Sequence, residues 1–277
     1  MEWLHGEIET NPAIGADEAA KKLVNDIKTV ADQMVEDAEA VVSRIHAEAE
    51  SAAIKLAAEA AKSVGNIKKD STRSASDMIL NAKGGGSEKK NALAASSIIK
   101  KAEDALSQLN KRTEASLKSL AEDAETTAFK FNRIAEAEER KLVNLENETK
   151  KNVIDAGKEA AAKFPMAEKG DTLSEDERKN AQLASAEVIK KLALAADRVH
   201  LATVEATKII QAASQEAALT MKKAIAKANR VINSAIEEAN EAILQAVSQA
   251  LASTVGEEEA EFFDLAPLKE KWGKRKT

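Results

Sequence analysis

Three histidines, at positions 5, 46 and 200, are the side chains best suited to metal binding or proton transfer. Asp197 and His200 have the i, i+3 spacing with which helical bundles hold paired metal ions. Such a centre needs two of these pairs and two further carboxylates, and only Glu2 and His5 repeat the spacing. The pattern therefore favours a polar pair on a helix surface, and we expect no metal and no other cofactor.

The segment Gly84-Gly85-Gly86-Ser87, with lysines at 89 and 90, superficially resembles a phosphate-binding loop. It lacks the GxxxxGK[ST] spacing and a preceding strand, so a turn between helices fits it better. The chain has no cysteine, which removes thiolate nucleophiles and cysteine-based metal sites. No carboxylate has an apolar sequence context that would raise its pKa for acid–base work. We therefore expect no catalytic residues and a protein that is not an enzyme.

The composition indicates long helices with a mixed-charge surface. Aromatic residues make up 3% of the chain, charged residues 32%, and the formal net charge is −6. Nucleic-acid binding requires a basic footprint, and anionic membranes attract basic segments, so this charge disfavours both partners. The sequence shows no signal peptide and no run of eighteen apolar residues, which predicts no transmembrane segment and a cytoplasmic protein.

An eleven-residue period organises the chain, and it is clearest between positions 188 and 255. Eleven residues in three turns give about 3.67 residues per turn, so packed helices should run nearly straight or wind gently to the right. The third segment has an aliphatic column and an alanine column at this spacing. Their members are Val188, Val199, Ile210, Met221, Ile232 and Ile243, and Ala184, Ala195, Ala206, Ala217, Ala228, Ala239 and Ala250. Repeated alanine predicts helix axes that approach closely.

The same period predicts two earlier helices, separated by the glycine-rich turn and by Pro165. The first of them could start at Asn11-Pro12, with Asn as the cap, or at Asp17 as a competing cap. We predict an all-α fold of three long antiparallel helices with hendecad periodicity, forming an elongated coiled-coil rod. The Gly and short polar residues between 65 and 77 predict fraying or a bend in the first helix. The expected segments are a leader (1–15), helix one (16–83), a turn (84–87), helix two (88–164), a connector (165–173), helix three (174–255) and an acidic, aromatic and basic tail (256–277).

Aromatic and large apolar residues gather outside the long helices and at their ends, where they could cap the bundle core or make contacts between molecules. Aromatic residues at both ends would permit head-to-tail assembly into filaments. The candidates for self-assembly or docking are Trp3, Leu4, Phe164, Phe262, Phe263, Leu265, Leu268 and Trp272.

These features favour a structural or scaffolding coiled-coil protein that self-associates into an oligomer or filament, laterally through its apolar stripes and longitudinally through its ends. One alternative is a coat of amphipathic helices on a lipid droplet or polyester storage granule. Another is a spacer whose tail, residues 257–277, docks a protein partner. The alanine-rich helical composition is similar to that of granule-coating phasins and of rotary-ATPase stator stalks, and no specific motif links the chain to either family.

Overall fold

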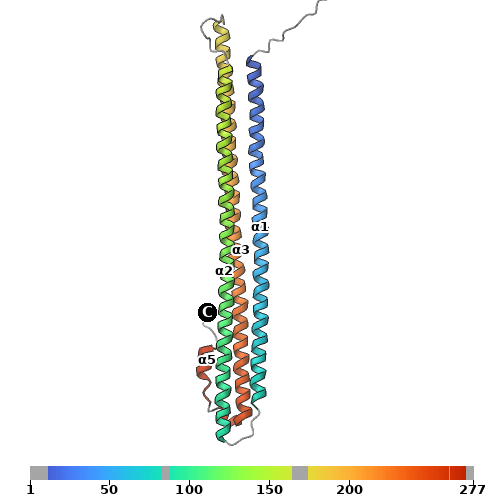
Figure 1. Ribbon diagram of the computed structural model, residues 1–277, viewed down its shortest axis with the longest axis vertical. Helices are drawn as coiled ribbons and strands as arrows, with labels where there is room; N and C mark the ends of the chain where they lie inside the picture. The colour runs from blue at the N-terminus through green and yellow to red at the C-terminus, as the bar shows by residue number, and fades with distance from the viewer. Residues whose placement is uncertain (1–11, 83–87, 164–173, 262, 273–277) are drawn as a thin grey trace, which may run out of the picture. The chain divides into compact units, whose positions relative to one another are not determined.

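The computed structural model describes residues 12–82, 88–163, 174–261 and 263–272 (Figure 1). Three long helices account for most of them: α1 (Pro12–Asn81), α2 (Glu88–Lys163) and α3 (Glu175–Val255). Two short helices follow, α4 (Glu257–Ala260) and α5 (Ala266–Trp272). The described part of the chain contains no strand. The predicted all-α fold with three long antiparallel helices is confirmed.

Helix α1 begins at Pro12, the earlier of the two starts that the sequence offers and four residues before the expected segment boundary at 16. Proline suits the first helical position, because its φ angle is preset and its missing N–H would have had no intrahelical partner there. The helix ends at Asn81 rather than 83, and α3 begins at Glu175 directly after Ser174. The predicted glycine-rich turn and the connector at 165–173 lie outside the described residues.

The predicted fraying between residues 65 and 77 is wrong, because α1 continues as an α-helix through this stretch. Its hydroxyl side chains bond to the helix itself. The Ser71 and Thr72 hydroxyls both donate to the Lys68 carbonyl oxygen, at 2.9 and 2.8 Å. Short polar side chains that bond backward in this way are compatible with a helix, at a small cost in stability.

The chain divides into two compact units, each built from a part of all three long helices. The described residues of the first unit are 12–47, 130–163 and 174–216. An ion pair joins Asp32 to Arg198 at 3.5 Å, and His46 Nε2 lies 3.3 Å from a Glu216 carboxylate oxygen, so residue numbers rise together along α1 and α3. Arg44 pairs with Glu138 at 3.5 Å. Helix α2 runs antiparallel to α3, because Glu146 contacts His200 while the earlier Asn132 contacts the later Ser214.

The second unit repeats this arrangement, and its described residues are 48–82, 88–129, 217–261 and 263–272. Lys68 pairs with Glu238 at 3.5 Å, and the Thr254 hydroxyl donates to the Ala82 carbonyl oxygen at 3.0 Å. These contacts again place α1 and α3 in the same direction. Arg112 contacts Asp70 at 2.7 Å and so places α2 beside α1.

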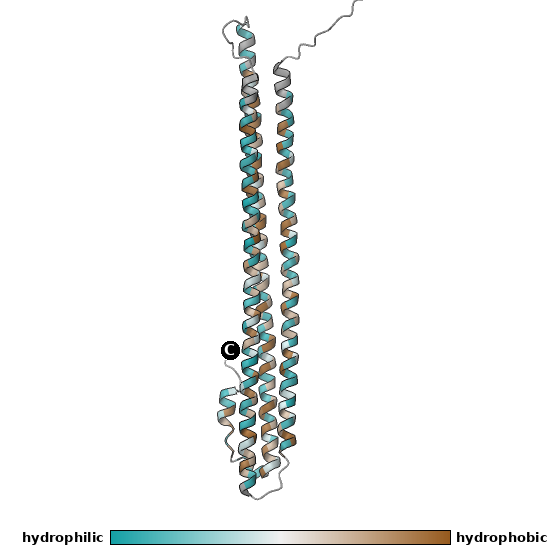
Figure 2. Ribbon diagram, in the orientation of Figure 1, coloured by the Kyte–Doolittle hydropathy of each residue, from teal (hydrophilic) through white to brown (hydrophobic). Residues whose placement is uncertain are grey.

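The eleven-residue columns form the core of each unit. Hydrophobic and hydrophilic residues are interspersed along every long helix (Figure 2), and the eleven-residue spacing identifies the hydrophobic ones that are buried. The predicted members of the aliphatic and alanine columns of α3 are buried except Ala184, which is half-buried near the start of the helix. Val199, Ala206, Ile232 and Ala250 are 0% exposed. The corresponding column of α2 is buried from Ile98 to Val153. Three helices of one chain therefore bury the stripes that none of them could bury alone.

Candidate functional site

The C-terminal segment turns back at Gly256, directly after α3. Gly256 has φ 93°, a left-handed conformation that side-chain-bearing residues rarely adopt, and its N–H donates to the Ala252 carbonyl oxygen at 3.0 Å. Its own carbonyl oxygen accepts from the Ala260 N–H at 3.0 Å in α4. One glycine therefore ends the long helix and begins the next, as expected for a helix-terminating glycine.

Helix α5 packs against α2 and α3 within the second unit. Leu268 is its buried apolar side chain, at 5% exposed. The Asn240 amide donates to the Trp272 carbonyl oxygen at 3.1 Å, and Lys271 pairs with Glu103 at 3.2 Å. The Lys271 ammonium also lies 5.1 Å from the centroid of the Trp272 ring. The tail thus uses its apolar and basic side chains on its own chain.

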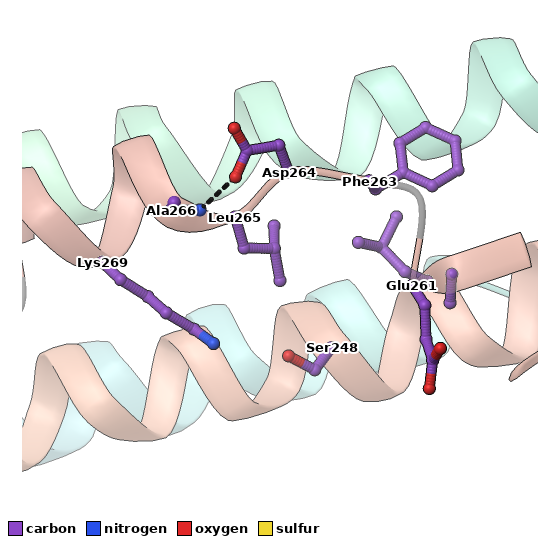
Figure 3. A pocket seen from close by; sticks show the side chains of 9 residues that line it. Ser248, Glu261, Phe263, Asp264, Leu265, Ala266 and Lys269 are labelled. Atoms are coloured by element: carbon purple, nitrogen blue, oxygen red, sulfur yellow. Dashed lines mark hydrogen bonds between the residues drawn. The ribbon is translucent and has the colours of Figure 1, made fainter. Parts of the chain in front are cut away.

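An open groove of about 570 Å³ lies between this segment and α3 (Figure 3). Leu251, Phe263 and Leu265 supply its apolar lining, and Ser248, Glu261 and Lys269 supply polar groups. Leu265 points from the returning segment toward the helix that carries Ser248, while the Asp264 carboxylate accepts from the Ala266 N–H at 2.8 Å. That bond satisfies a donor at the start of α5. The Ser248 hydroxyl donates to the Leu244 carbonyl oxygen of its own helix at 3.2 Å.

The predicted docking residues divide into those that the structure describes and those that it does not. Trp3, Leu4, Phe164 and Phe262 lie outside the described residues. Of the others, Leu268 is buried, and Phe263, Leu265 and Trp272 are half-buried. The Trp272 indole N–H is buried without a hydrogen-bond acceptor in the part of the chain described.

Two asparagines form a polar contact inside the second unit, and the sequence patterns did not predict this contact. The buried Asn110 amide donates to the Asn240 side-chain oxygen at 3.2 Å and to the Leu106 carbonyl oxygen at 2.8 Å. Asn240 in turn donates to Trp272, so the two asparagines link α2, α3 and α5. Buried polar groups must find partners, and a matched pair favours one helix register over others. Each asparagine follows a column residue directly, which was the available signal.

A second polar cluster lies in the first unit around Glu146, whose side chain is only 10% exposed. His200 Nδ1 lies 2.9 Å from Glu146 Oε1, and Lys150 bonds the same oxygen. Sequence spacing predicts a pair of His200 with Asp197 on one helix, whereas in the structure the partner of His200 is Glu146 on α2. In the same unit, the Ser214 hydroxyl donates to the Asn132 side-chain oxygen at 2.9 Å. Helices α2 and α3 therefore run in opposite directions.

The environment of Glu146 lowers the pKa of its carboxyl group. Burial raises this pKa. The hydrogen bonds from Lys150 and His200, the positive charge of Lys150 and a hydrogen bond from Thr203 favour the charged form, and together they outweigh burial. The carboxylate is thus held ionised between two basic groups, which is a structural arrangement. A general acid or base would need a pKa closer to the working pH.

Replacing Glu146 with glutamine is expected to lower the free energy of unfolding by about 1–2 kcal/mol near pH 7, because charge-assisted hydrogen bonds are lost. The pKa of Glu146 is lower in the folded protein than in the unfolded chain, so its ionised form stabilises the fold at pH values above the unfolded-state pKa. This stabilisation is lost as the pH falls through the folded-state pKa. The difference between the wild type and Glu146→Gln should therefore shrink in urea titrations below about pH 4. Glu148→Gln, an exposed change on the same helix, is the control. A constant difference across pH would contradict the assignment.

The remaining sequence motifs do not converge on a chemical centre. His46 on α1 contacts Glu216 on α3, and both side chains are exposed. Glu216 lies sixteen residues after His200 on α3, so the two histidines belong to separate contacts. Among the described residues, no three histidine, aspartate or glutamate side chains cluster closely enough to hold a metal ion. Nor does any helix in the described ranges combine the length and apolarity needed to cross a membrane.

The fold defines an all-α three-helix bundle, and a solved structure shares it. The chain is similar to a computationally designed three-helix bundle, with a TM-score of 0.64 and 16% sequence identity, over 87% of this chain and 97% of the designed one. At this identity the likeness concerns the fold alone. No protein-family model matches the chain, and no curated protein matches it in sequence.

Proposed function

We propose that this protein is a non-enzymatic structural scaffold that self-associates through the outer faces of its helices. The supporting observation is that large apolar side chains remain exposed after the core columns have been buried within the chain. Leu183, Leu194 and Leu201 on α3 are 61%, 61% and 66% exposed. Single exposed apolar residues are ordinary, whereas several on one helix face suggest a contact surface.

The predicted route of lateral assembly needs revision in this proposal. The eleven-residue columns were expected to be available between chains, yet they are occupied by packing inside each unit. Assembly through them would require a unit to open and lose its own core. The outer faces carry no such cost, so they are the better candidates for contacts between copies.

The docking-tail alternative receives less support. Leu268 is buried and Lys271 is paired with Glu103 on the chain's own surface. A partner at α5 would have to replace these contacts. The coat alternative draws on the same exposed leucines as self-association, and the two are separated by experiment.

Sedimentation velocity over a range of protein concentrations tests the proposal, followed by negative-stain microscopy of the same samples. A self-associating scaffold should show a sedimentation coefficient that rises with concentration and should remain in the unbound fraction when floated with lipid vesicles or polyester particles. A single monomeric species at all concentrations up to about 100 μM, for which any association would be weaker than about 5–6 kcal/mol, would refute it. Flotation with the particles would support the coat function instead.

A further inference from the structure

Helix α3 carries a line of apolar side chains on the face opposite its core columns. The line consists of Leu183, Leu194, Leu201 and Ala212, all exposed. Their spacings of eleven, seven and eleven residues place them within about 20° of one another around the helix, at 100° per residue. The core residues Val199, Ala206 and Ile210 point the other way and are at most 1% exposed. This line therefore takes no part in the core of the first unit.

Four exposed charged residues lie beside these apolar ones, in a repeated order. Glu187 and Lys190 stand between Leu183 and Leu194, while Glu205 and Lys208 stand between Leu201 and Ala212. The order of apolar, acidic, basic and apolar residues thus recurs after eighteen residues, which is five turns of helix. We call these eight positions the outer stripe.

The outer stripe is complementary to itself when a second copy runs in the opposite direction. With the two-fold axis between positions 197 and 198, Leu194 of one copy lies level with Leu201 of the other. Glu187 then faces Lys208, and Lys190 faces Glu205. Leu183 faces Ala212 at the ends. Each level therefore joins two apolar side chains or two opposite charges, as antiparallel helix pairs require.

We propose that two copies of this chain associate through the outer stripe of α3, with the two helices antiparallel about a two-fold axis near residues 197 and 198. This inference rests on the proposed self-association and names its surface. The contact is isologous, because the same patch is used by both copies, and it closes as a dimer. Arg198, beside the axis, already has an acidic neighbour in its own unit, Asp32 at 3.5 Å.

Charge order favours a second copy over a lipid surface. A helix that lies on lipid gains from a wide apolar face with its charges on the opposite side. Here acidic and basic side chains lie in line with the leucines, where lipid would have to accommodate them. A second copy pairs each charge with its opposite. Glu187 also contacts Lys191 of its own helix at 3.2 Å, an exposed pair of the weak kind that can rearrange on binding.

A charge exchange tests the pairing by sedimentation equilibrium of the full chain. Glu187→Lys would set lysine against Lys208 at two symmetric levels, and the dimer dissociation constant should rise about tenfold. Adding Lys208→Glu restores opposite charges at both levels and should return the constant to within about threefold of wild type. Glu148→Lys, an exposed change on α2, should have little effect. Failure of the second change to rescue the first would overturn the proposed pairing.

Apolar contacts are tested separately with Leu194→Asp, which should weaken the dimer by at least about tenfold. Leu93→Asp is the matched control, since this exposed leucine lies outside the outer stripe. Circular dichroism should give equal helix content for all variants. Association of the wild type that none of the stripe variants weakens would refute this surface and leave self-association standing. A wild type that never associates would refute the proposed function itself.

The orientation is tested by spin-label distances, which the absence of cysteine makes simple. A single label at Gln182→Cys should lie about 47 Å along the axis from its counterpart, from 1.5 Å per residue on each side of the two-fold axis. A label at Ala186→Cys, an exposed position outside the eight of the outer stripe, should give about 35 Å by the same rise. A parallel pair would give short, equal distances at both sites, and that result would overturn the antiparallel arrangement. If substitution of the outer-stripe leucines abolished flotation with lipid vesicles and left dimerisation unchanged, lipid would be the occupant of the stripe.

Discussion

Replacing Phe131 with alanine is expected to lower the free energy of unfolding by about 3–5 kcal/mol. Phe131 is 0% exposed and occupies the eleven-residue column of α2 in the first unit. Its removal takes away the largest fully buried side chain of the described residues and leaves a cavity that the packed helices can fill only in part. Urea unfolding followed by circular dichroism measures the loss.

Phe129 supplies an internal control, two residues away on the same helix. It is 63% exposed, so Phe129→Ala should change the unfolding free energy by no more than about 0.5 kcal/mol. The two substitutions remove the same atoms from the same type of backbone and differ in burial. Equal effects at the two positions would mean that the eleven-residue column does not identify the core.

The same period explains how much of the fold could be predicted from sequence. A helix with one apolar stripe must bury it against neighbours, and a strict eleven-residue spacing keeps that stripe on one side over many turns. Ile98, Leu109 and Leu120 could therefore be recognised as core residues of α2 without knowledge of their partners. Helix α2 ends at Lys163, shortly before Pro165, and proline disfavours helical backbone in the residue that precedes it. Gly256 ends α3 because glycine readily adopts its left-handed conformation.

Partners across helices could not be predicted in the same way. Every stripe has similar residues at each level, so sequence alone does not set the vertical alignment of one helix against another. The contacts of Asn110 with Asn240 and of Glu146 with His200 depend on that alignment. Once the alignment is known, the polar pairs help to explain it, since a shift would leave buried groups without partners.

The packing of the C-terminal segment against its own helices could not be predicted for a different reason. Few groups hold α5 in place. They are chiefly the buried Leu268 side chain, the Lys271 ammonium and the Trp272 backbone carbonyl oxygen. Their combined contribution is small, and it depends on a surface assembled from α2 and α3. A short amphipathic segment has the same sequence whether it packs on its own bundle or on another protein. The outer stripe was detectable as an eighteen-residue recurrence, but the more regular core columns of the same helix masked it.

Replacing Ala206 with leucine is expected to lower the free energy of unfolding by about 1–3 kcal/mol, although leucine adds apolar area. Ala206 belongs to the alanine column and is 0% exposed, so a larger side chain must displace neighbours or force helices apart. Ala193→Leu, at an exposed position of the same helix, should cost no more than about 0.5 kcal/mol, because leucine is a good helix former. Both variants are compared by urea unfolding. Stability retained in Ala206→Leu would mean that the alanine column reflects helix propensity, and that close approach of the helices does not require it.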